Sequence, residues 1–499
     1  MKGPRLLAGV GLGLLFLTAA IGTPADADLW GHVTFGRDIL ASGHIKQADR
    51  YSFTSDRPWV NHEWLSEVSF AEAYRLAGPA GLVAVKLIVI AALLAVIWRH
   101  ARRLRAPAPI AIALLAMAFV GTFWRTHTVR PQLFSVLCFA TLLVILVRAE
   151  QGRLRGLLVL PLLMAAWVNL HGGWIVGLGM LGVWTAVQIM RPSIPAAARL
   201  MIAAAGLATV LATLANPHGV QLWTFLGETV RLGRDDIEEW GSVLTHPIAI
   251  GVPWIVTLIA AGLSFWRFPR ARRFEYACII GLLAFASFRV SRLDAFFALA
   301  VVVLLTPELV SLLTRGRDSF PLQLRGNDSR PPVGMTVITI VTVAAMLVPA
   351  ARIIGPYATC LTIAGPWVPE REAGEFITLN KLSGRMLTWF DWGEYAIWHF
   401  GPNVQVSIDG RRETVYSDQV VQAHRRFYAA DATALSYLNT LNPDYIWLPK
   451  RVPVASRVAE AGWQMVFSGP TSIVWAHAGA GPFQRADAPP AGMRCFPDQ

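Results

Sequence analysis

The sequence contains few charged residues. Asp, Glu, Lys and Arg make up 15% of the 499 residues, whereas soluble globular domains contain about 25%. Hydrophobic residues make up 54% of the chain, and the mean hydropathy is +0.47. This composition excludes an ordinary soluble protein and predicts a polytopic membrane protein.

Cysteine is also scarce. Four cysteines are too few for a disulfide scaffold. Cys138 and Cys278 lie in apolar runs, where cysteine behaves as a small hydrophobic residue. Cys360 and Cys495 lie in the polar C-terminal part, and they are expected to pair only if that part is in an oxidising compartment. The sequence leaves this pairing open.

Two further features are missing. The chain has no Gly-rich loop of the kind that cradles a nucleotide phosphate, and it has no internal repeat. A net charge of +12 often indicates a nucleic-acid partner, but that requires basic residues on one accessible face. Here they lie in short loops between apolar runs, so we expect no nucleic-acid partner.

About eleven apolar runs are candidate membrane spans, although several are shorter than the ~20 residues that cross a bilayer without tilt. They cover residues 6–21, 82–98, 110–124, 133–147, 157–168, 174–190, 200–214, 252–266, 277–288, 295–313 and 335–348. The runs at 157–168 and 277–288 are the weakest candidates.

Arginines are concentrated in alternate loops, at residues 99–105, 148–155, 191–199, 267–273 and 315–330. Cytoplasmic loops are enriched in Lys and Arg, so this alternation places the amino terminus in the cytoplasm. The run 6–21 is either a retained span or a signal peptide cleaved near residues 25–27. Both alternatives leave the next residues on the outer face.

The outer stretch 24–78 is long and polar for a connector. It contains Asp-Ala-Asp-Leu-Trp-Gly-His (26–32), Asp-Arg-Tyr-Ser-Phe-Thr (49–54) and Trp-Val-Asn-His-Glu-Trp (59–64). Carboxylates, imidazoles and indoles are thus crowded between two predicted spans. We expect the reaction centre here.

Two helices are predicted within this stretch. Residues 28–41 have an amphipathic pattern capped by Asp26 or Asp28. We expect the apolar side chains of this helix to lie in the membrane interface: Leu29, Val33, Ile39 and Leu40. A second helix is expected from about residue 59 or 61 to residue 76, with Glu63 and Glu67 facing a cavity.

The composition becomes mixed after residue 351, which predicts a soluble outer domain of ordinary size. Strands are expected at 386–390, 395–398, 404–408, 445–448 and 473–475, with helices at 419–439 and 454–461. The segments Asp391-Trp392-Gly393 and Asp409-Gly410-Arg411-Arg412 have turn character. They are either structural turns or contacts to a substrate.

These features resemble the glycosyltransferases of the GT-C fold, which include protein O-mannosyltransferases and the lipid A aminoarabinose transferase. The shared features are an acidic residue after the first span, an interfacial helix, about eleven spans and an outer C-terminal domain. The motifs above are similar to a widespread set of bacterial membrane proteins assigned to that fold. The further motifs are Asn-Leu-His-Gly-Gly-Trp (169–174), Asn-Pro-His-Gly (216–219) and Asp-Trp-Gly-Glu-Tyr (391–395).

The resemblance implies a polytopic α-helical protein of the bacterial plasma (inner) membrane. Residues 1–350 would form the transmembrane catalytic domain and residues 351–499 an extracytoplasmic α/β domain. The implied activity is transfer of a sugar from a polyprenyl-phosphate donor to an acceptor hydroxyl on the outer face. The acceptor is left open as a glycan, a lipid or a protein.

In characterised members the acidic residue of the first outer loop acts as a general base or a metal ligand. Asp28 is the matching residue, Asp26 is the second candidate, and Glu63 is a further catalytic candidate. A carboxylate that takes the proton of the attacking hydroxyl contributes roughly 10²–10⁴-fold in rate. A divalent cation is left open, with Asp28 and Glu63 as its ligands.

Several outer loops contain arginines against the positive-inside bias. Guanidinium forks match phosphate oxygens, and preorganised cations stabilise the charge that grows on a leaving phosphate. The candidates for substrate binding are His32, Arg37, His62, Arg125, His127, Arg130, His171, Glu239, Arg289 and Arg292. We expect them to meet Asp28 in one outer pocket.

Each candidate also has a structural interpretation. An arginine at the end of a span often reaches to the interface or pairs with a neighbouring carboxylate, as Asp294 allows for Arg289 and Arg292. A single histidine there is usually a structural residue.

Two other functions compete with glycosyl transfer. An O-antigen polymerase or ligase also combines many spans with outer arginines, but it typically has its large polar loop late in the chain. A transporter would be expected to show inverted repeats and polar groups in mid-span, and neither is evident. The missing nucleotide loop also counts against a cytoplasmic nucleotide-sugar donor.

Overall fold

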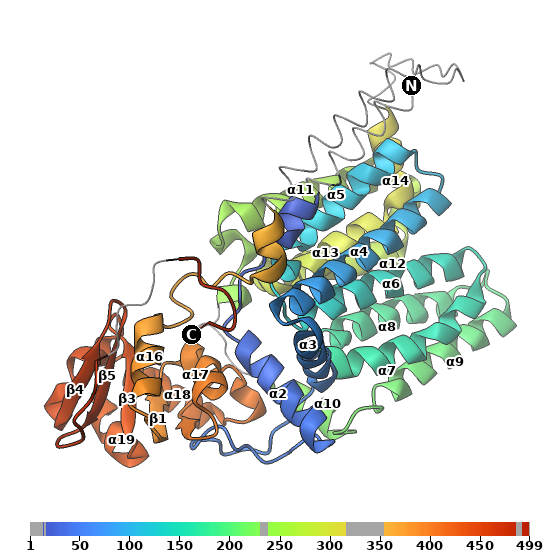
Figure 1. Ribbon diagram of the computed structural model, residues 1–499. Helices are drawn as coiled ribbons and strands as arrows, with labels where there is room; N and C mark the ends of the chain where they lie inside the picture. The colour runs from blue at the N-terminus through green and yellow to red at the C-terminus, as the bar shows by residue number, and fades with distance from the viewer. Residues whose placement is uncertain (1–12, 14–15, 230–237, 316–353, 486–491, 499) are drawn as a thin grey trace, which may run out of the picture. The chain divides into compact units, whose positions relative to one another are not determined.

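The computed structural model describes residues 13, 16–229, 238–315, 354–485 and 492–498 (Figure 1). The chain divides into two compact units, each described here by itself. Unit 1 comprises Met1–Thr23, Val83–Gly219 and Gly233–Thr359, and unit 2 comprises Pro24–Leu82, Val220–Leu232 and Cys360–Gln499. The expected run 335–348, the loop 316–330 and the first part of the run 6–21 lie outside the described residues.

Unit 1 is helical in its described part. Its helices are α4 (Pro79–Arg103, from Val83 onward), α5 (Ala108–Thr126), α6 (Gln132–Glu150), α7 (Leu160–Leu170), α8 (Trp174–Met190), α9 (Ala196–Ala212), α11 (Ile248–Arg267), α12 (Phe274–Arg289), α13 (Asp294–Leu304) and α14 (Thr306–Arg315). Helices are the natural outcome for apolar runs in lipid, because every backbone polar group must be bonded within its own segment.

Four of the described helices, α4, α5, α6 and α11, are long and apolar enough to cross a membrane. The pair α13 and α14, bent by 72°, would make a fifth span. Shorter apolar helices cover Leu154–Leu170, Trp174–Met190 and Ala196–Ala212. The chain is thus a membrane protein, and the total of about eleven spans stays a prediction.

Helix α13 forms the centre of unit 1. All of its residues are buried, and it packs against α5, α6, α11 and α12. Between helices in lipid, close contact depends on small residues. Ala298 of α13 lies against Gly121 of α5, where a side chain on the glycine would collide with it.

Unit 2 combines the outer stretch 24–78 with the C-terminal part. Two helices that pack together come from the outer stretch, α2 (Leu29–Ser42) and α3 (Trp64–Ala77), and α10 (Gln221–Thr229) also belongs to this unit. The C-terminal helices are α16 (Arg371–Leu379), α17 (Gly393–Phe400), α18 (Asp418–Tyr428) and α19 (Ala434–Leu441). The unit thereby joins residues that the sequence analysis assigned to two domains.

A five-stranded sheet lies in the C-terminal part (Figure 1). Its strands are β1 (Gly384–Thr388), β2 (Val404–Val406), β3 (Tyr445–Pro449), β4 (Trp463–Ser468) and β5 (Ser472–His477). The order is β2-β1-β3-β5-β4; the first three strands are parallel, and β5 is antiparallel to both β3 and β4.

This part differs from the expectations at one strand and one helix, and it contains one strand that was not expected; the helix expected at 419–439 is two helices, α18 and α19. Residues 395–398 belong to helix α17, which is buried on nearly all sides, so its apolar residues show no period that separates helix from strand. Strand β4 was not expected. Half of its residues are exposed, so its sequence lacks the clear apolar run of a buried strand.

Two of the four α2 side chains that were expected in the membrane interface are instead buried in protein. Leu29 and Val33 are fully buried in unit 2, where α2 packs against α3 and α17. Leu40, near the end of the helix, is 46% exposed. The apolar stripe therefore belongs largely to a protein core, a case in which an amphipathic pattern does not distinguish lipid from protein.

The open question about the cysteines is settled by the structure, which forms a disulfide between Cys360 and Cys495. Short backbone bridges join Thr362 to Pro24 and to Cys495. The segment that leads into α2 is therefore linked to the beginning and to the end of the C-terminal part.

Candidate functional site

A carboxylate cluster lies where two parallel strands end. Asp391 and Glu394 follow β1, and Asp409 follows β2. The carboxyl ends of neighbouring parallel strands share one edge of a sheet, which is where open α/β sheets usually bind ligands. With Asp28, these three residues are called the carboxylate cluster below.

Asp28 lies directly before α2 and belongs to this cluster. The backbone N–H of Gly31, in the first turn of α2, donates to Glu394 Oε2 over 3.1 Å. A side chain at Gly410 would collide with the carboxylates of both Asp28 and Glu394. Glycine at 410 therefore lets the two carboxylates approach the turn after β2. The Asp28 N–H itself donates to Asp26 Oδ1 over 3.1 Å.

Two members of the cluster have raised pKa values. Burial, and then the charges of Asp28 and Asp409, raise the pKa of Glu394 well above its ordinary value. Burial also raises the pKa of Asp391 to about 6, with Asp28 and Asp26 adding to the effect. Carboxyl groups this close favour one ionised and one neutral partner, as expected of acid and base pairs.

Arg411 is buried beside the cluster and is saturated with partners. Its guanidinium group donates two hydrogen bonds to Asp409, at 2.9 and 2.7 Å, and two to Asp49, at 2.7 and 3.1 Å. It also lies about 5 Å from three aromatic rings, those of Phe35, Tyr51 and Trp59. Such contacts add cation–π attraction.

The segment Asp409-Gly410-Arg411 is therefore more than a turn. Tyr416 donates a further hydrogen bond to Asp409 Oδ2 over 2.8 Å. Residues of the outer stretch and of the C-terminal part thus share one ion network within unit 2.

The other predicted residues of the outer stretch have mostly local partners. His32 Nδ1 lies 3.7 Å from Glu67 Oε1, and Asn61 donates to Glu67 Oε2 over 2.6 Å. Burial lowers the pKa of His32, but Glu67, Glu63 and Asp28 outweigh it, so the pKa is raised overall. Glu63 precedes α3 as its cap residue.

His62 and Arg37 complete the predicted set in unit 2. His62 Nε2 lies 3.6 Å from Glu63 Oε1, and its ring lies against Phe225 of α10. The Arg37 guanidinium lies 4.1 Å from the centre of the Trp398 ring.

Unit 1 contains a second polar centre, the arginine cluster, which consists of Arg125, Arg130 and Arg292 with Glu239 and Asp294. Arg125 Nε donates to Asp294 Oδ1 over 3.0 Å, and Arg125 Nη1 lies 3.0 Å from Glu239 Oε1. Arg130 Nη1 lies 3.5 Å from the same oxygen, and Arg292 Nε lies 4.0 Å from Glu239 Oε2.

Different elements supply these side chains. Arg125 is in the last turn of α5, Asp294 begins α13, Arg292 lies just before α13, and Glu239 lies in a short 3₁₀ turn after α10. Burial raises the pKa of Glu239, but the charges of Arg130, Arg292 and Arg125 dominate and lower the pKa to about 2. The carboxylate is therefore ionised at any physiological pH.

Three further predicted residues lie in unit 1. His171 Nδ1 accepts from the Gly173 N–H over 3.0 Å and lies 2.7 Å from Ser135 Oγ, so this ring nitrogen has structural partners. His127 Nδ1 lies 3.0 Å from the Trp124 carbonyl oxygen. Arg289 is exposed at the end of α12.

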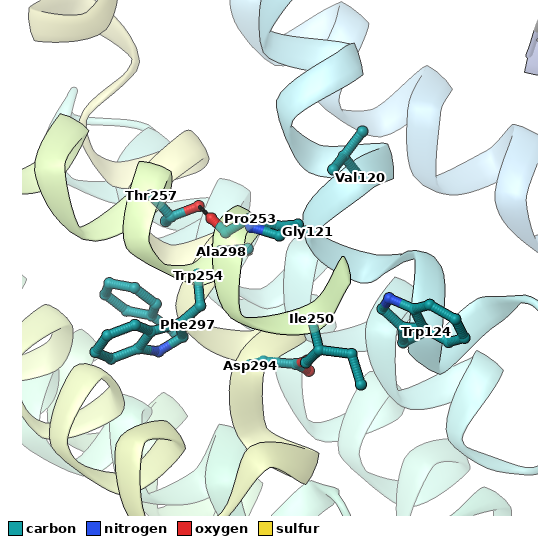
Figure 2. A pocket seen from close by; sticks show the side chains of 10 residues that line it. All are labelled: Val120, Gly121, Trp124, Ile250, Pro253, Trp254, Thr257, Asp294, Phe297 and Ala298. Carbon is teal, nitrogen blue, oxygen red and sulfur yellow. Dashed lines mark hydrogen bonds between the residues drawn. The ribbon is translucent and has the colours of Figure 1, made fainter. Parts of the chain in front are cut away.

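A pocket adjoins the arginine cluster within unit 1. It lies among α5, α11 and α13 (Figure 2) and is lined by Val120, Gly121, Trp124, Ile250, Pro253, Trp254, Thr257, Asp294, Phe297 and Ala298. Asp294 is the only charged residue of this lining, and it accepts a hydrogen bond from Arg125. The apolar pocket therefore lies next to a guanidinium group through this pair.

Sequence reasoning missed Lys86 and Glu394. Lys86 is fully buried in α4, and its ammonium group donates to the carbonyl oxygens of Gly22 and His127 over 3.2 and 3.0 Å. The signal was present, because a single lysine interrupts the apolar run 82–98. Glu394 lies in the Asp-Trp-Gly-Glu-Tyr motif but was not singled out, since its role depends on its contact with Gly31 of α2.

The predicted site residues are thus distributed over both units. Asp26, Asp28, His32, Arg37, His62 and Glu63 lie in unit 2, and the remaining seven lie in unit 1. Their convergence in one pocket stays a prediction. Among the residues that the structure describes, no group of three or more His, Cys, Asp or Glu side chains is arranged to hold a metal ion.

No protein-family model matches the sequence, and no curated protein matches it. Solved structures do. The chain is similar to the oligosaccharyltransferase of Archaeoglobus fulgidus in its apo form, with a TM-score of 0.59 and 11% identity over 95% of this chain and 74% of that one.

Two further structures are similar over almost the whole chain. One is the archaeal oligosaccharyltransferase AglB from Archaeoglobus fulgidus in complex with an inhibitory peptide and a dolichol-phosphate (TM-score 0.52, 11% identity, 96% of this chain and 75% of that one). The other is ArnT from Cupriavidus metallidurans in the apo state (TM-score 0.51, 14% identity, 96% and 98%). The chain has the GT-C fold.

Proposed function

We propose that this protein is a membrane glycosyltransferase that moves a sugar from a polyprenyl-phosphate donor to an acceptor hydroxyl on the outer face. The observation that carries the proposal is the carboxylate cluster at Asp28 in a chain with the GT-C fold. The AglB complex with a dolichol-phosphate supports a donor of this lipid class.

In this proposal, Asp28 is the general base. The acceptor oxygen attacks the anomeric carbon, and its proton passes to the Asp28 carboxylate. The bond from the anomeric carbon to the phosphate oxygen breaks, and the polyprenyl phosphate leaves with the electron pair. Burial raises the pKa of Glu394 well above its ordinary value, which favours the neutral form of this neighbour of Asp28. Asp26 and Glu63 remain the second and third candidates.

The phosphate of the leaving lipid is assigned to the arginine cluster. Its guanidinium groups lie at the ends of helices, beside a pocket whose lining is otherwise uncharged. Guanidinium groups are suited to phosphate oxygens, and they stabilise the charge that develops during departure. Lys86 and Arg289 are further cations of the same unit.

The disulfide supports an extracytoplasmic location for unit 2. Disulfides persist in oxidising compartments and are rare in the cytoplasm, and Cys360 is bonded to Cys495. The location in the inner membrane, the count of about eleven spans and the acceptor class are parts of the proposal that rest on the sequence. A divalent cation at Asp28 and Glu63 stays open, and no step above requires it.

The test uses purified full-length protein with a panel of undecaprenyl-phosphate-linked hexoses and pentoses, and it measures the release of undecaprenyl phosphate. Asp28→Asn is expected to lower the rate by roughly 10²–10⁴-fold because the base is lost. Asp38→Asn is the matched control, since Asp38 lies in α2, the helix that follows Asp28, and pairs with Arg50. It should retain the wild-type rate.

Two results would count against the proposal. An Asp28→Asn variant as fast as the wild type would remove Asp28 as the base. Wild-type protein that releases no lipid phosphate from any member of the panel would remove the donor class.

A further inference from the structure

Glu239 occupies the centre of the arginine cluster. One of its carboxylate oxygens lies 3.0 Å from Arg125 Nη1 and 3.5 Å from Arg130 Nη1, and the other lies 4.0 Å from Arg292 Nε. Three guanidinium groups thus face one carboxylate. This is the arrangement that a bound phosphate group would take among arginines.

The carboxylate fits only one of these arginines closely. Charge-assisted hydrogen bonds between N–H and carboxylate are typically about 2.7–2.9 Å long; the contact with Arg125, at 3.0 Å, is near this range, whereas those with Arg130 and Arg292, at 3.5 and 4.0 Å, are well beyond it. A carboxylate has two oxygens that accept hydrogen bonds, whereas a phosphate monoester has three terminal oxygens that accept them. A phosphate group could therefore place an oxygen closer to Arg292, the arginine that lies furthest from the Glu239 carboxylate.

Arg125 keeps its position without Glu239. Its Nε donates to Asp294 Oδ1, which also accepts from the Ala295 N–H over 2.6 Å. Both side chains of this pair are less than 10% exposed. The guanidinium group of Arg125 is therefore held by its own buried partner.

Only the side chain of Glu239 needs to move. Its carbonyl oxygen accepts from Ser291 Oγ over 3.0 Å, and the Ser291 N–H donates to the Gly241 carbonyl over 2.9 Å. These bonds fix the backbone of the turn beside Arg292. The side chain of Glu239 is 30% exposed, so its carboxylate has solvent to rotate into.

We propose that Glu239 is a built-in competitor for the anion site formed by Arg125, Arg130 and Arg292, and that a lipid phosphate takes the place of its carboxylate. The inference rests on the proposed function and deepens it. Among the described side chains of the arginine cluster, displacement of Glu239 removes one of the two carboxylates that pair with the three guanidinium groups. This change favours a phosphate monoester, which carries about −1.5 to −2 at pH 7.

The neighbouring pocket places apolar side chains beside the anion site. Asp294 belongs both to the pocket lining and to the pair that holds Arg125. An anion bound at the arginines would therefore have apolar surface beside it, which inorganic phosphate has no group to fill. The specificity of the site thus comes from a competing carboxylate on one side and an apolar pocket on the other.

The experiment measures the affinity of the full-length protein in detergent micelles for undecaprenyl phosphate, undecaprenol and inorganic phosphate. Glu239→Gln removes the competing charge and keeps the size of the side chain. It is expected to bind undecaprenyl phosphate about tenfold tighter than the wild type, which corresponds to one charge-assisted hydrogen bond. Undecaprenol, which lacks the anion, should gain nothing.

Glu275→Gln is the matched control. Glu275 is a buried glutamate of unit 1 that likewise pairs with arginines, namely Arg191 at 2.6 Å and Arg273 at 2.5 Å, but it lies outside the arginine cluster. The affinity of the Glu275→Gln variant for undecaprenyl phosphate should equal that of the wild type. If Glu239→Gln fails to fold, Glu239→Asp keeps the charge, withdraws it by one methylene group and should tighten binding less.

The outcomes separate the two proposals. Wild-type binding of undecaprenyl phosphate with equal or weaker binding by Glu239→Gln overturns the competitor role and leaves the proposed donor class intact. No binding of undecaprenyl phosphate by any variant overturns the donor class itself. Equal tightening for inorganic phosphate overturns the assignment to a lipid phosphate.

Discussion

The two polar centres of this protein have opposite charge balances. In unit 2, Asp409 and Asp49 bind the guanidinium group of Arg411, and Asp28, Asp391 and Glu394 add three further carboxyl groups to the cluster. In unit 1, three arginines share Glu239 and Asp294. The first centre has carboxylate to spare and suits proton transfer. The second has positive charge to spare and suits an anionic group.

The arginines of the two centres differ in how completely they are bonded. Arg411 makes four hydrogen bonds to two carboxylates, and its side chain is 5% exposed. Arg292 lies 4.0 Å from its carboxylate, and its side chain is 33% exposed. A saturated buried arginine contributes to the fold, whereas a loosely paired exposed one retains donors for a ligand.

The largest expected effect is at Arg411. Arg411→Met leaves Asp409 and Asp49 as uncompensated buried charges, and breaking such a pair typically costs about 3–5 kcal/mol. Arg292→Met, at the partly exposed site, should cost less than about 1 kcal/mol. The denaturant midpoints of both variants in detergent micelles measure the difference. Equal losses of stability would show that the two arginines do not differ in their contribution to the fold.

A smaller effect is expected on ligand affinity, and for this property the change at Arg292 should matter more than the change at Arg411. Arg292→Met should weaken binding of undecaprenyl phosphate about tenfold, since one charge-assisted contact is lost. Arg267→Met is the control, because Arg267 is an exposed arginine in the last turn of α11 outside the arginine cluster. A titration with undecaprenyl phosphate tests this, and equal affinities of the two variants would contradict the prediction.

The smallest effect concerns pH and Glu394. In the folded protein burial raises the pKa of Glu394, whereas in the unfolded chain the pKa returns to about 4.3. Above that pH the unfolded state loses a proton that the folded state keeps, so this group lowers stability as pH rises from about 4.3 toward the folded pKa. Glu394→Gln removes the titration and keeps an acceptor for the Gly31 N–H.

The apparent melting temperature against pH measures this effect. The variant and the wild type should be similar near pH 4, and the variant should become relatively more stable above it. Glu72→Gln is the control, since Glu72 is on the surface and pairs with Arg75. Curves that remain parallel across the range would mean that Glu394 does not titrate differently in the folded state.

Part of the fold followed from the sequence. Helix α2 was expected at 28–41 and covers Leu29–Ser42, and the strands near 386, 404, 445 and 473 are present. Helix α17 and the burial of α2 were missed, because a helix that is buried on several sides has no polar face to reveal its period. Local pattern therefore identified most elements but not their neighbours.

The site shows the same limit. Asp28 and the outer arginines were singled out from their residue types and loop positions. Glu394, which accepts a hydrogen bond from Gly31, is 363 residues away from it in the sequence. The bond between Asp49 and Arg411 joins residues that are 362 apart. The segment Asp409-Gly410-Arg411 was expected to be a turn because Asp-Gly favours turns, and its partners come from the first loop.

The sequence alone determined the membrane class, the polar outer stretch and the candidate base, because hydrophobicity, charge asymmetry and periodicity are sums over neighbouring residues. Tertiary structure decided that Glu394 and Gly410 lie beside Asp28, and that Glu239 is shared by three arginines. The physical reason is that burial and ion pairing depend on side chains brought from distant parts of the chain, and these contacts set which groups hold or release charge.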